Sequence, residues 1–89
     1  MVSVVVPVLN EENGLKININ TIIKNIPENE EYEVVIVDDG SKDDTWEKIR
    51  ELSEENKCIV GVRFSRNFGK ESALMAGLAH TSGDAVTPR

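Results

Sequence analysis

The apolar residues of this chain follow two spacings, one typical of buried strands and one typical of helices. β-Branched residues dominate Val2–Val6 and fill Val34–Val37, as expected of strands covered on both faces in a parallel sheet. Between these runs, apolar side chains recur at helical spacing and form one stripe. The stripe consists of Leu15, Ile19, Ile22, Ile23 and Ile26.

Punctuating residues predict where the first elements begin and end. Pro7 lacks an N–H and is expected to end the first strand. Asn10 is a candidate N-cap, with Glu11 and Glu12 in the first turn, where the helix dipole favours negative charge. Pro27 is expected to close this helix, and the S-x-x-D spacing of residues 41–44 predicts the start of a second one.

The rest of the chain repeats the alternation. Trp46, Ile49 and Leu52 carry the second helix, and Cys58–Phe64 is expected to form a third strand. A third helix, rich in small residues, is expected to open at Gly69 and to break at residues 82–83. A fourth strand starts at residue 85, but the sequence Thr-Pro-Arg is expected to stop it after about two residues.

This order predicts an α/β fold with right-handed crossovers and a parallel sheet covered by helices. We expect a single domain, residues 1–89, that forms a Rossmann-like half-domain. It would hold a three-stranded parallel sheet with flanking helices and an aborted fourth strand. We further expect that the chain is a truncated piece of a longer one.

Composition narrows the class of protein. The chain has 39% hydrophobic residues and a net charge of −6, which suits a globular fold and argues against a general nucleic-acid role. No apolar run reaches the roughly 18–20 residues of a membrane span, and no basic stretch leads into a signal-like core. The single cysteine, Cys58, cannot form an internal disulfide. A cytoplasmic location is therefore expected.

The candidate chemistry follows the second strand, which runs directly into Asp38, Asp39, Gly40 and Ser41. In open α/β sheets, ligands bind at the carboxyl ends of the strands. Adjacent strand residues point in opposite directions, so the two carboxylates cannot serve the same contact. One could face a ligand while the other holds the turn. The alternative, that both only end the strand and cap a helix, stays open.

Two further segments reach the same sheet edge. Residues 7–12, after the first strand, could hydrogen-bond a base or ribose, or could simply form a helix N-terminus. Residues 63–70, after the third strand, bring three cations to a helix N-terminus and could bind an anion, or could be a solvated basic loop. Neither a Walker A loop nor a G-x-G-x-x-G motif is present.

Together, the segments VSVVVPVLNEEN, YEVVIVDDGSKDDTW and FSRNFGKESALMAGLAHTSGDAV resemble the family 2 glycosyltransferases of GT-A fold. The last segment is most similar to the polyprenyl-phosphate branch, which includes bactoprenol glucosyltransferases and dolichol-phosphate mannose synthases. The resemblance implies transfer of a hexose from a UDP- or GDP-sugar to a polyprenyl phosphate. Many full-length relatives are associated with the cytoplasmic face of the membrane and contribute to cell-envelope glycan synthesis.

The resemblance also assigns roles to individual residues. The implied nucleotide-sugar-binding residues are Pro7, Leu9, Glu11, Val37, Asp39, Arg66 and Lys70. The first three would lie along the base and ribose, and Leu9 stands where the family often has a tyrosine. Asp39 would accept from N–H groups of the base, whereas Lys70 and Arg66 would lie near the diphosphate. Asp38, Gly40 and Ser41 would be structural neighbours of the site.

The chain departs from the family pattern at its carboxyl end. Relatives continue the GDAV strand into an Asp-x-Asp motif that binds a divalent metal, Mg2+ or Mn2+, but here Thr-Pro-Arg follows. The metal ligands and the catalytic base of the family are absent from this chain, so we expect negligible transferase activity from it alone. Without a full fourth strand, Val2–Val6 would be an exposed edge through which the chain could self-associate.

A competing hypothesis is a non-catalytic nucleotide-binding or assembly module. A third, a nucleotidyltransferase, would need a glycine- and arginine-rich loop after the first strand, and PVLNEEN lacks one.

Overall fold

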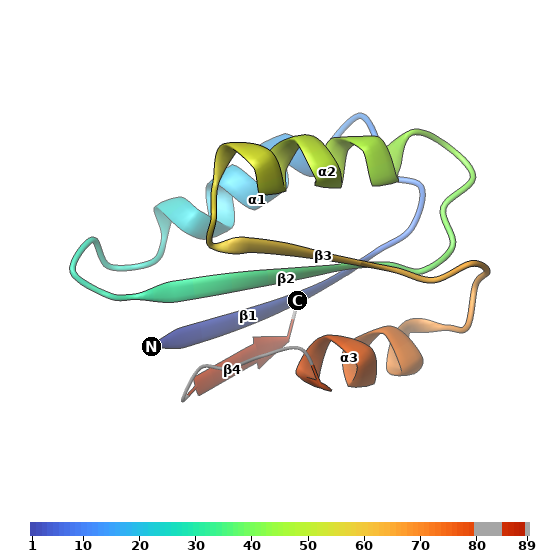
Figure 1. Ribbon diagram of the computed structural model, residues 1–89. Helices are drawn as coiled ribbons and strands as arrows, with labels where there is room; N and C mark the ends of the chain where they lie inside the picture. The colour runs from blue at the N-terminus through green and yellow to red at the C-terminus, as the bar shows by residue number, and fades with distance from the viewer. Residues whose placement is uncertain (80–84, 89) are drawn as a thin grey trace.

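The computed structural model describes residues 1–79 and, for their backbone, residues 85–88. Strands and helices alternate along the chain, and the four strands form one parallel sheet in the order β3-β2-β1-β4 (Figure 1). The predicted parallel α/β architecture is therefore confirmed. The elements are β1 (Val2–Val8), α1 (Leu15–Lys24), β2 (Tyr32–Asp38), α2 (Thr45–Glu55), β3 (Ile59–Arg63), α3 (Lys70–Ala79) and β4 (Ala85–Pro88). The predicted helix break at residues 82–83 lies outside the described residues.

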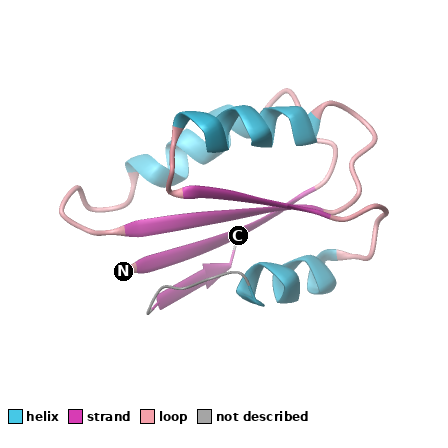
Figure 2. Cartoon of the chain, in the orientation of Figure 1, coloured by secondary structure: helices cyan, strands magenta, loops and turns pink. Residues whose placement is uncertain are grey.

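Helices cover the two faces of the sheet unequally, with α1 and α2 on one face and α3 on the other (Figures 1 and 2). Val34 and Ile36 of β2 pack toward the α1/α2 layer, together with Leu15, Ile19 and Ile49. The intervening residues of β2, Val35 and Val37, pack with Val5 and Ala73 toward α3. Both faces of β2 are thus buried, which is why its sequence is continuously apolar rather than alternating.

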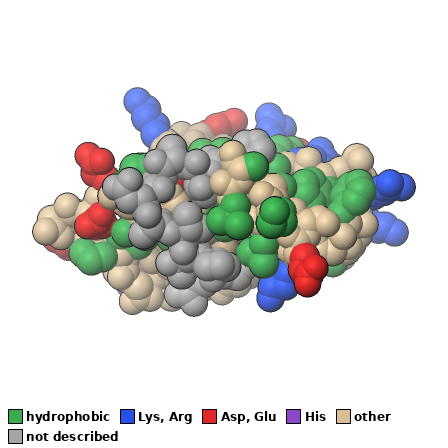
Figure 3. Space-filling model, turned by 90° about the horizontal axis from the view of Figure 1, so that it is seen from below, with side chains coloured by type: hydrophobic (Ala, Val, Ile, Leu, Met, Phe, Trp, Pro, Cys, Tyr) green, Lys and Arg blue, Asp and Glu red, His purple; other side chains and the backbone are tan. Residues whose placement is uncertain are grey.

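Helix α3 approaches the sheet at a glycine. A Cβ atom at Gly77 would lie 2.2 Å from Cγ1 of Val5 and 3.2 Å from Cγ2 of Val37. The outer surface on this side carries apolar side chains (Figure 3), and the large exposed ones on α3 are Met75 and Leu78. Among the described residues, no helix combines the length and the apolar character that crossing a membrane requires.

Pro7 does not end β1, which continues to Val8 with Pro7 paired to Val37. The backbone N–H of Val2 and the carbonyl of Val8 both bond toward β2. Because successive residues of a strand alternate in direction, the nitrogen of Pro7 faces the β4 side. There, among the described residues, β4 pairs with Val2–Val5 of β1 and not with Pro7, so the missing N–H of Pro7 interrupts no ladder bond in the described sheet.

The fourth strand is longer than the sequence predicts. It runs for four residues, Ala85–Pro88, and pairs in parallel with Val2–Val5 of β1. Pro88 is tolerated because β4 is an edge strand of the described sheet, where one row of backbone N–H groups has no ladder partner. The expectation that β1 leaves an exposed edge is therefore wrong over Val2–Val5.

The residues predicted to cap α1 and α2 form other contacts instead. Helix α1 begins at Leu15, not directly after Asn10, and Asp44 precedes α2 without a side-chain capping bond. Asn10 adopts a positive φ of 52°, and its Oδ1 accepts from the N–H of Lys42. The hydroxyl of Ser41 accepts from the N–H of Asn10. Hydrogen bonds between the loop after β1 and the loop after β2 thus take the place of the predicted helix caps. Such contacts between distant segments cannot be predicted from the local sequence.

Candidate functional site at the carboxyl edge of the sheet

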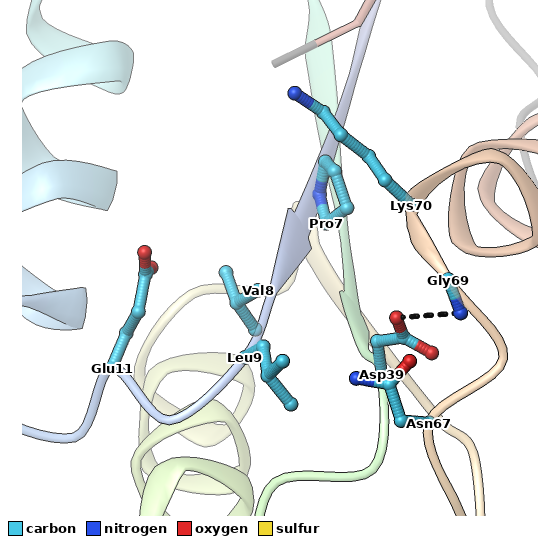
Figure 4. Close-up of a pocket in the computed structure, with 8 residues that line it drawn as sticks. All are labelled: Pro7, Val8, Leu9, Glu11, Asp39, Asn67, Gly69 and Lys70. Atoms are coloured by element: carbon cyan, nitrogen blue, oxygen red, sulfur yellow. Dashed lines mark hydrogen bonds between the residues drawn. The ribbon is translucent and has the colours of Figure 1, made fainter.

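A cavity of about 330 Å³ opens at the carboxyl ends of β1 and β2, beside the start of α3 (Figure 4). This is the sheet edge at which open α/β folds bind their ligands. Glu11 lies on one side of the cavity, and Gly69 and Lys70 lie on the other (Figure 4). The lining residues are Pro7, Val8, Leu9, Glu11, Asp39, Asn67, Gly69 and Lys70.

The loop after β1 is held by the loop after β2. The N–H of Asn10 donates to the hydroxyl of Ser41 at 2.8 Å, and the N–H of Glu11 donates to Oγ1 of Thr45 at 2.8 Å. A longer contact of 3.4 Å joins the N–H of Glu12 to Oδ2 of Asp43. These bonds join segments more than thirty positions apart. They fix the backbone that presents Leu9 and Glu11 to the cavity.

Asp38 and Asp39 point to opposite sides, as their adjacent positions predict. Asp38 is fully buried, and its Oδ1 accepts from the N–H of Ser41 at 2.8 Å, which closes the turn through Gly40. Its Oδ2 has no hydrogen-bond partner among the described residues. Asp38 does not line the cavity. Asp38 therefore holds the turn that follows β2.

Asp39 faces the loop before α3. Its Oδ1 accepts from the N–H of Phe68 at 2.8 Å, and its Oδ2 accepts from the N–H of Gly69 at 3.1 Å (Figure 4 draws the second bond). Its own N–H donates to the carbonyl of Val8 at 3.0 Å. The side chain lines the cavity although the residue is only 5% exposed. Asp39 therefore connects all three segments that surround the cavity.

Five of the seven predicted binding residues line this cavity: Pro7, Leu9, Glu11, Asp39 and Lys70. The other two do not. Val37 is fully buried against α3, and the guanidinium of Arg66 lies 4.9 Å from the centre of the Phe68 ring. Val37 can therefore shape the site only from beneath in this structure, and Arg66 is stacked on the loop surface.

Three lining residues, Val8, Asn67 and Gly69, were not predicted individually. Val8 was missed because Pro7 was expected to end the strand, which continues through it. Asn67 and Gly69 belong to the basic segment 63–70, where the prediction of an anion site rests on the three cations and not on the uncharged residues. The signal for Gly69 is its position before a helix, where it adopts a φ of +100°.

The charges at the cavity are two carboxylates, Glu11 and Asp39, and one ammonium group, Lys70. Behind these groups, Asp43 accepts hydrogen bonds from the hydroxyl of Thr45 and from backbone N–H groups. These bonds, that of the hydroxyl above all, lower the pKa of Asp43 below its ordinary value of 3.8. Within residues 1–79, no three Asp, Glu, His or Cys side chains gather as metal ligands would. The described residues therefore do not fit a divalent metal, and we assign no chemical step to one.

The fold defines this chain as a Rossmann-like half-domain of GT-A type. Residues 3–88 match the family model described as "Glycosyl transferase family 2", and the chain belongs to that family. A bactoprenol glucosyl transferase of Shigella phage SfX is 48% identical over 89 residues, a match that covers 98% of this chain. The chain spans only 29% of that relative's length.

Solved structures of similar proteins carry nucleotides and nucleotide sugars. A mannosyltransferase from Pyrobaculum calidifontis, in complex with GDP-Man and Mn2+, superimposes with a TM-score of 0.84 at 30% identity. S. aureus TarS 1–349 in complex with UDP superimposes with a TM-score of 0.83 at 27% identity. These matches cover 98% and 99% of this chain and 26% of each neighbour.

Proposed function

We propose that this chain is the nucleotide-sugar-binding part of a glycosyltransferase that takes a hexose from a UDP- or GDP-sugar. The observation that carries the proposal is the cavity at the carboxyl edge of β1 and β2, because it gathers five of the residues expected to bind the nucleotide. A Rossmann-like half-sheet with its ligand at this edge is the usual arrangement for binding a nucleotide.

The base and ribose would lie along the β1 side of the cavity. Leu9, 41% exposed, offers an apolar surface to a base, and Pro7 extends that surface toward the sheet. The carboxylate of Glu11 can accept hydrogen bonds from ribose hydroxyls. Each oxygen of Asp39 accepts one backbone N–H and keeps a further lone pair for an N–H of the base. Val37 would support the base from beneath.

The diphosphate would lie at the α3 side of the cavity. Lys70 is the first residue of α3, where the N–H groups of the first helical turn lie, and its side chain extends from there toward Pro7 (Figure 4). Such a helix N-terminus favours an anion, because its N–H groups have no partner within the helix. Arg66 would join the diphosphate only by leaving the ring of Phe68.

The acceptor follows from the relatives rather than from the cavity. Because the similar phage protein is a bactoprenol glucosyl transferase, we propose a polyprenyl phosphate as the acceptor of the whole enzyme. Such a lipid would place the reaction at the cytoplasmic face of a membrane.

Binding of nucleotides to the 89-residue chain tests the proposal. Isothermal titration with UDP, GDP, UDP-glucose and GDP-mannose would be run on the wild type and on Lys70→Ala. Loss of a charge-assisted contact should weaken binding of the preferred nucleotide roughly tenfold or more. Lys57→Ala is the matched control, because Lys57 is exposed and precedes β3, at the opposite end of the strands.

Binding by the wild type that weakens in Lys70→Ala and not in Lys57→Ala would support the proposal. A folded wild-type chain that binds none of the four compounds at millimolar concentration would contradict it. Equal weakening in both variants would contradict the placement of the diphosphate.

A further inference from the structure

We propose that Asp39 is a positioning residue for the loop 66–69, in addition to its place in the cavity. Its carboxylate holds the backbone of this loop so that Asn67 and Lys70 line the site. The inference rests on the proposed function for the identity of the ligand, a nucleoside diphosphate. The fastening of the loop itself does not depend on that identity.

The main observation is that the carboxylate of Asp39 accepts two hydrogen bonds from the loop. Phe68 and Gly69 are consecutive residues, and their N–H groups donate to the two separate oxygens of Asp39. Hydrogen bonds to an ionised acceptor are roughly twice as strong as neutral ones, and burial strengthens them further. Two such bonds at adjacent amides fix both the position and the direction of the loop.

The neighbouring residue, Gly40, allows a second close contact between the turn and the loop. Gly40 has a φ of +81°, and a Cβ atom there would lie 2.4 Å from the carbonyl carbon of Arg66 and 2.5 Å from the nitrogen of Asn67. The loop backbone therefore rests directly on the turn after β2. Asp39 and Gly40 together join that turn to the loop along residues 66–69.

The fastened amides, those of Phe68 and Gly69, lie among the three lining residues of this segment, Asn67, Gly69 and Lys70. Asn67 comes immediately before Phe68, and Lys70 comes immediately after Gly69. Gly69, with a φ of +100°, turns the chain into α3, whose first residue is Lys70. Release of the two amides would therefore displace both lining side chains and the start of α3.

A ligand without a base separates this role from a direct base contact. Affinities for UDP and for inorganic pyrophosphate would be measured on the wild type, Asp39→Asn, Gly69→Ala and Asp44→Asn. Gly69→Ala keeps the carboxylate and both N–H groups but strains the backbone at positive φ, and its Cβ meets nothing within 4 Å. Asp44→Asn is the charge control, because Asp44 is exposed and makes no side-chain capping bond.

We expect Asp39→Asn and Gly69→Ala each to weaken pyrophosphate binding at least about fivefold, and Asp44→Asn to leave it within twofold of the wild type. If Asp39→Asn weakens UDP binding but not pyrophosphate binding, Asp39 contacts only the base and the proposal is overturned. A wild type that binds UDP without measurable affinity for pyrophosphate would also overturn it.

Amide hydrogen exchange of the ligand-free chain tests the fastening by itself. The amides of Phe68 and Gly69 should be protected in the wild type and in Asp44→Asn, and should exchange roughly tenfold faster or more in Asp39→Asn. If no variant binds any nucleotide, the proposed function fails and this exchange alone decides the positioning role. Equal exchange of both amides in the wild type and Asp39→Asn would overturn it.

Discussion

The N–H of Glu11 donates to Oγ1 of Thr45 at 2.8 Å, a bond that joins the loop after β1 to the first residue of α2. Thr45 is fully buried, and its hydroxyl and N–H both also contact Oδ1 of Asp43. Glu11, which lines the cavity, is thus positioned by Thr45, which does not line it. The wall of the cavity depends on a contact behind it.

Replacement of Thr45 by valine should destabilise the chain by about 1–2 kcal/mol. The change keeps the branched shape but leaves the N–H of Glu11 without its acceptor. Urea unfolding measures the loss. Thr21→Val is the control, because the exposed hydroxyl of Thr21 bonds only a carbonyl of its own helix. Equal stabilities of the two variants would contradict the role assigned to Thr45.

The stability that Asp43 contributes should be lost in acid. Because its pKa is lowered in the folded chain, protonation favours unfolding once the pH falls below the ordinary value of 3.8 toward the folded value. At neutral pH, Asp43→Asn should therefore have a lower urea midpoint than the wild type, and the difference should shrink below about pH 4. A difference that stays constant from pH 6 to pH 3 would contradict this account.

Gly77 sets the distance between α3 and the sheet. Gly77→Ala should destabilise the chain by about 1–3 kcal/mol, because the new Cβ would overlap Val5 and this overpacking exceeds the gain in helix propensity. Chemical denaturation measures the change. Ser72→Ala, at an exposed position of the same helix, should cause no loss. If Gly77→Ala is as stable as the wild type, the close packing of α3 is wrong.

Leu9 tests the proposed place of the base. Leu9→Tyr should tighten binding of UDP or GDP at least about fivefold, since an aromatic ring offers a stacking surface that leucine lacks. Isothermal titration measures the change. Ile17→Tyr is a control at an exposed position of α1, where a new ring should not alter the affinity. A gain in both variants, or in neither, would argue against a base beside Leu9.

Much of the fold could be predicted because its signals are local. The continuous apolar run Val34–Val37 indicates a strand buried on both faces, and the spacing of Leu15 and Ile19 indicates a helix packed on one side. The errors arose where distant segments decide the outcome. Whether Pro7 ends β1 depends on which way its nitrogen faces, and whether Pro88 ends β4 depends on the strand's place at the sheet edge.

The site was predicted less completely for the same reason. Sequence spacing brings Glu11, Asp39 and Lys70 to one edge because parallel strands end there together. It cannot show that both oxygens of Asp39 accept backbone N–H groups from residues 29 and 30 positions away. Nor can it show that Arg66 stacks on Phe68 instead of facing the cavity.

Chemical-shift mapping of the 15N-labelled chain with UDP and with GDP tests the central claim most directly. A nucleotide bound in the cavity should shift the backbone amides of residues 8–11, 37–41 and 66–70, which belong to the three segments around it. The amides of residues 28–31, in the acidic turn before β2, should not move. A folded chain that shows no shifts with either nucleotide, or shifts that cluster outside these three segments, would contradict the account.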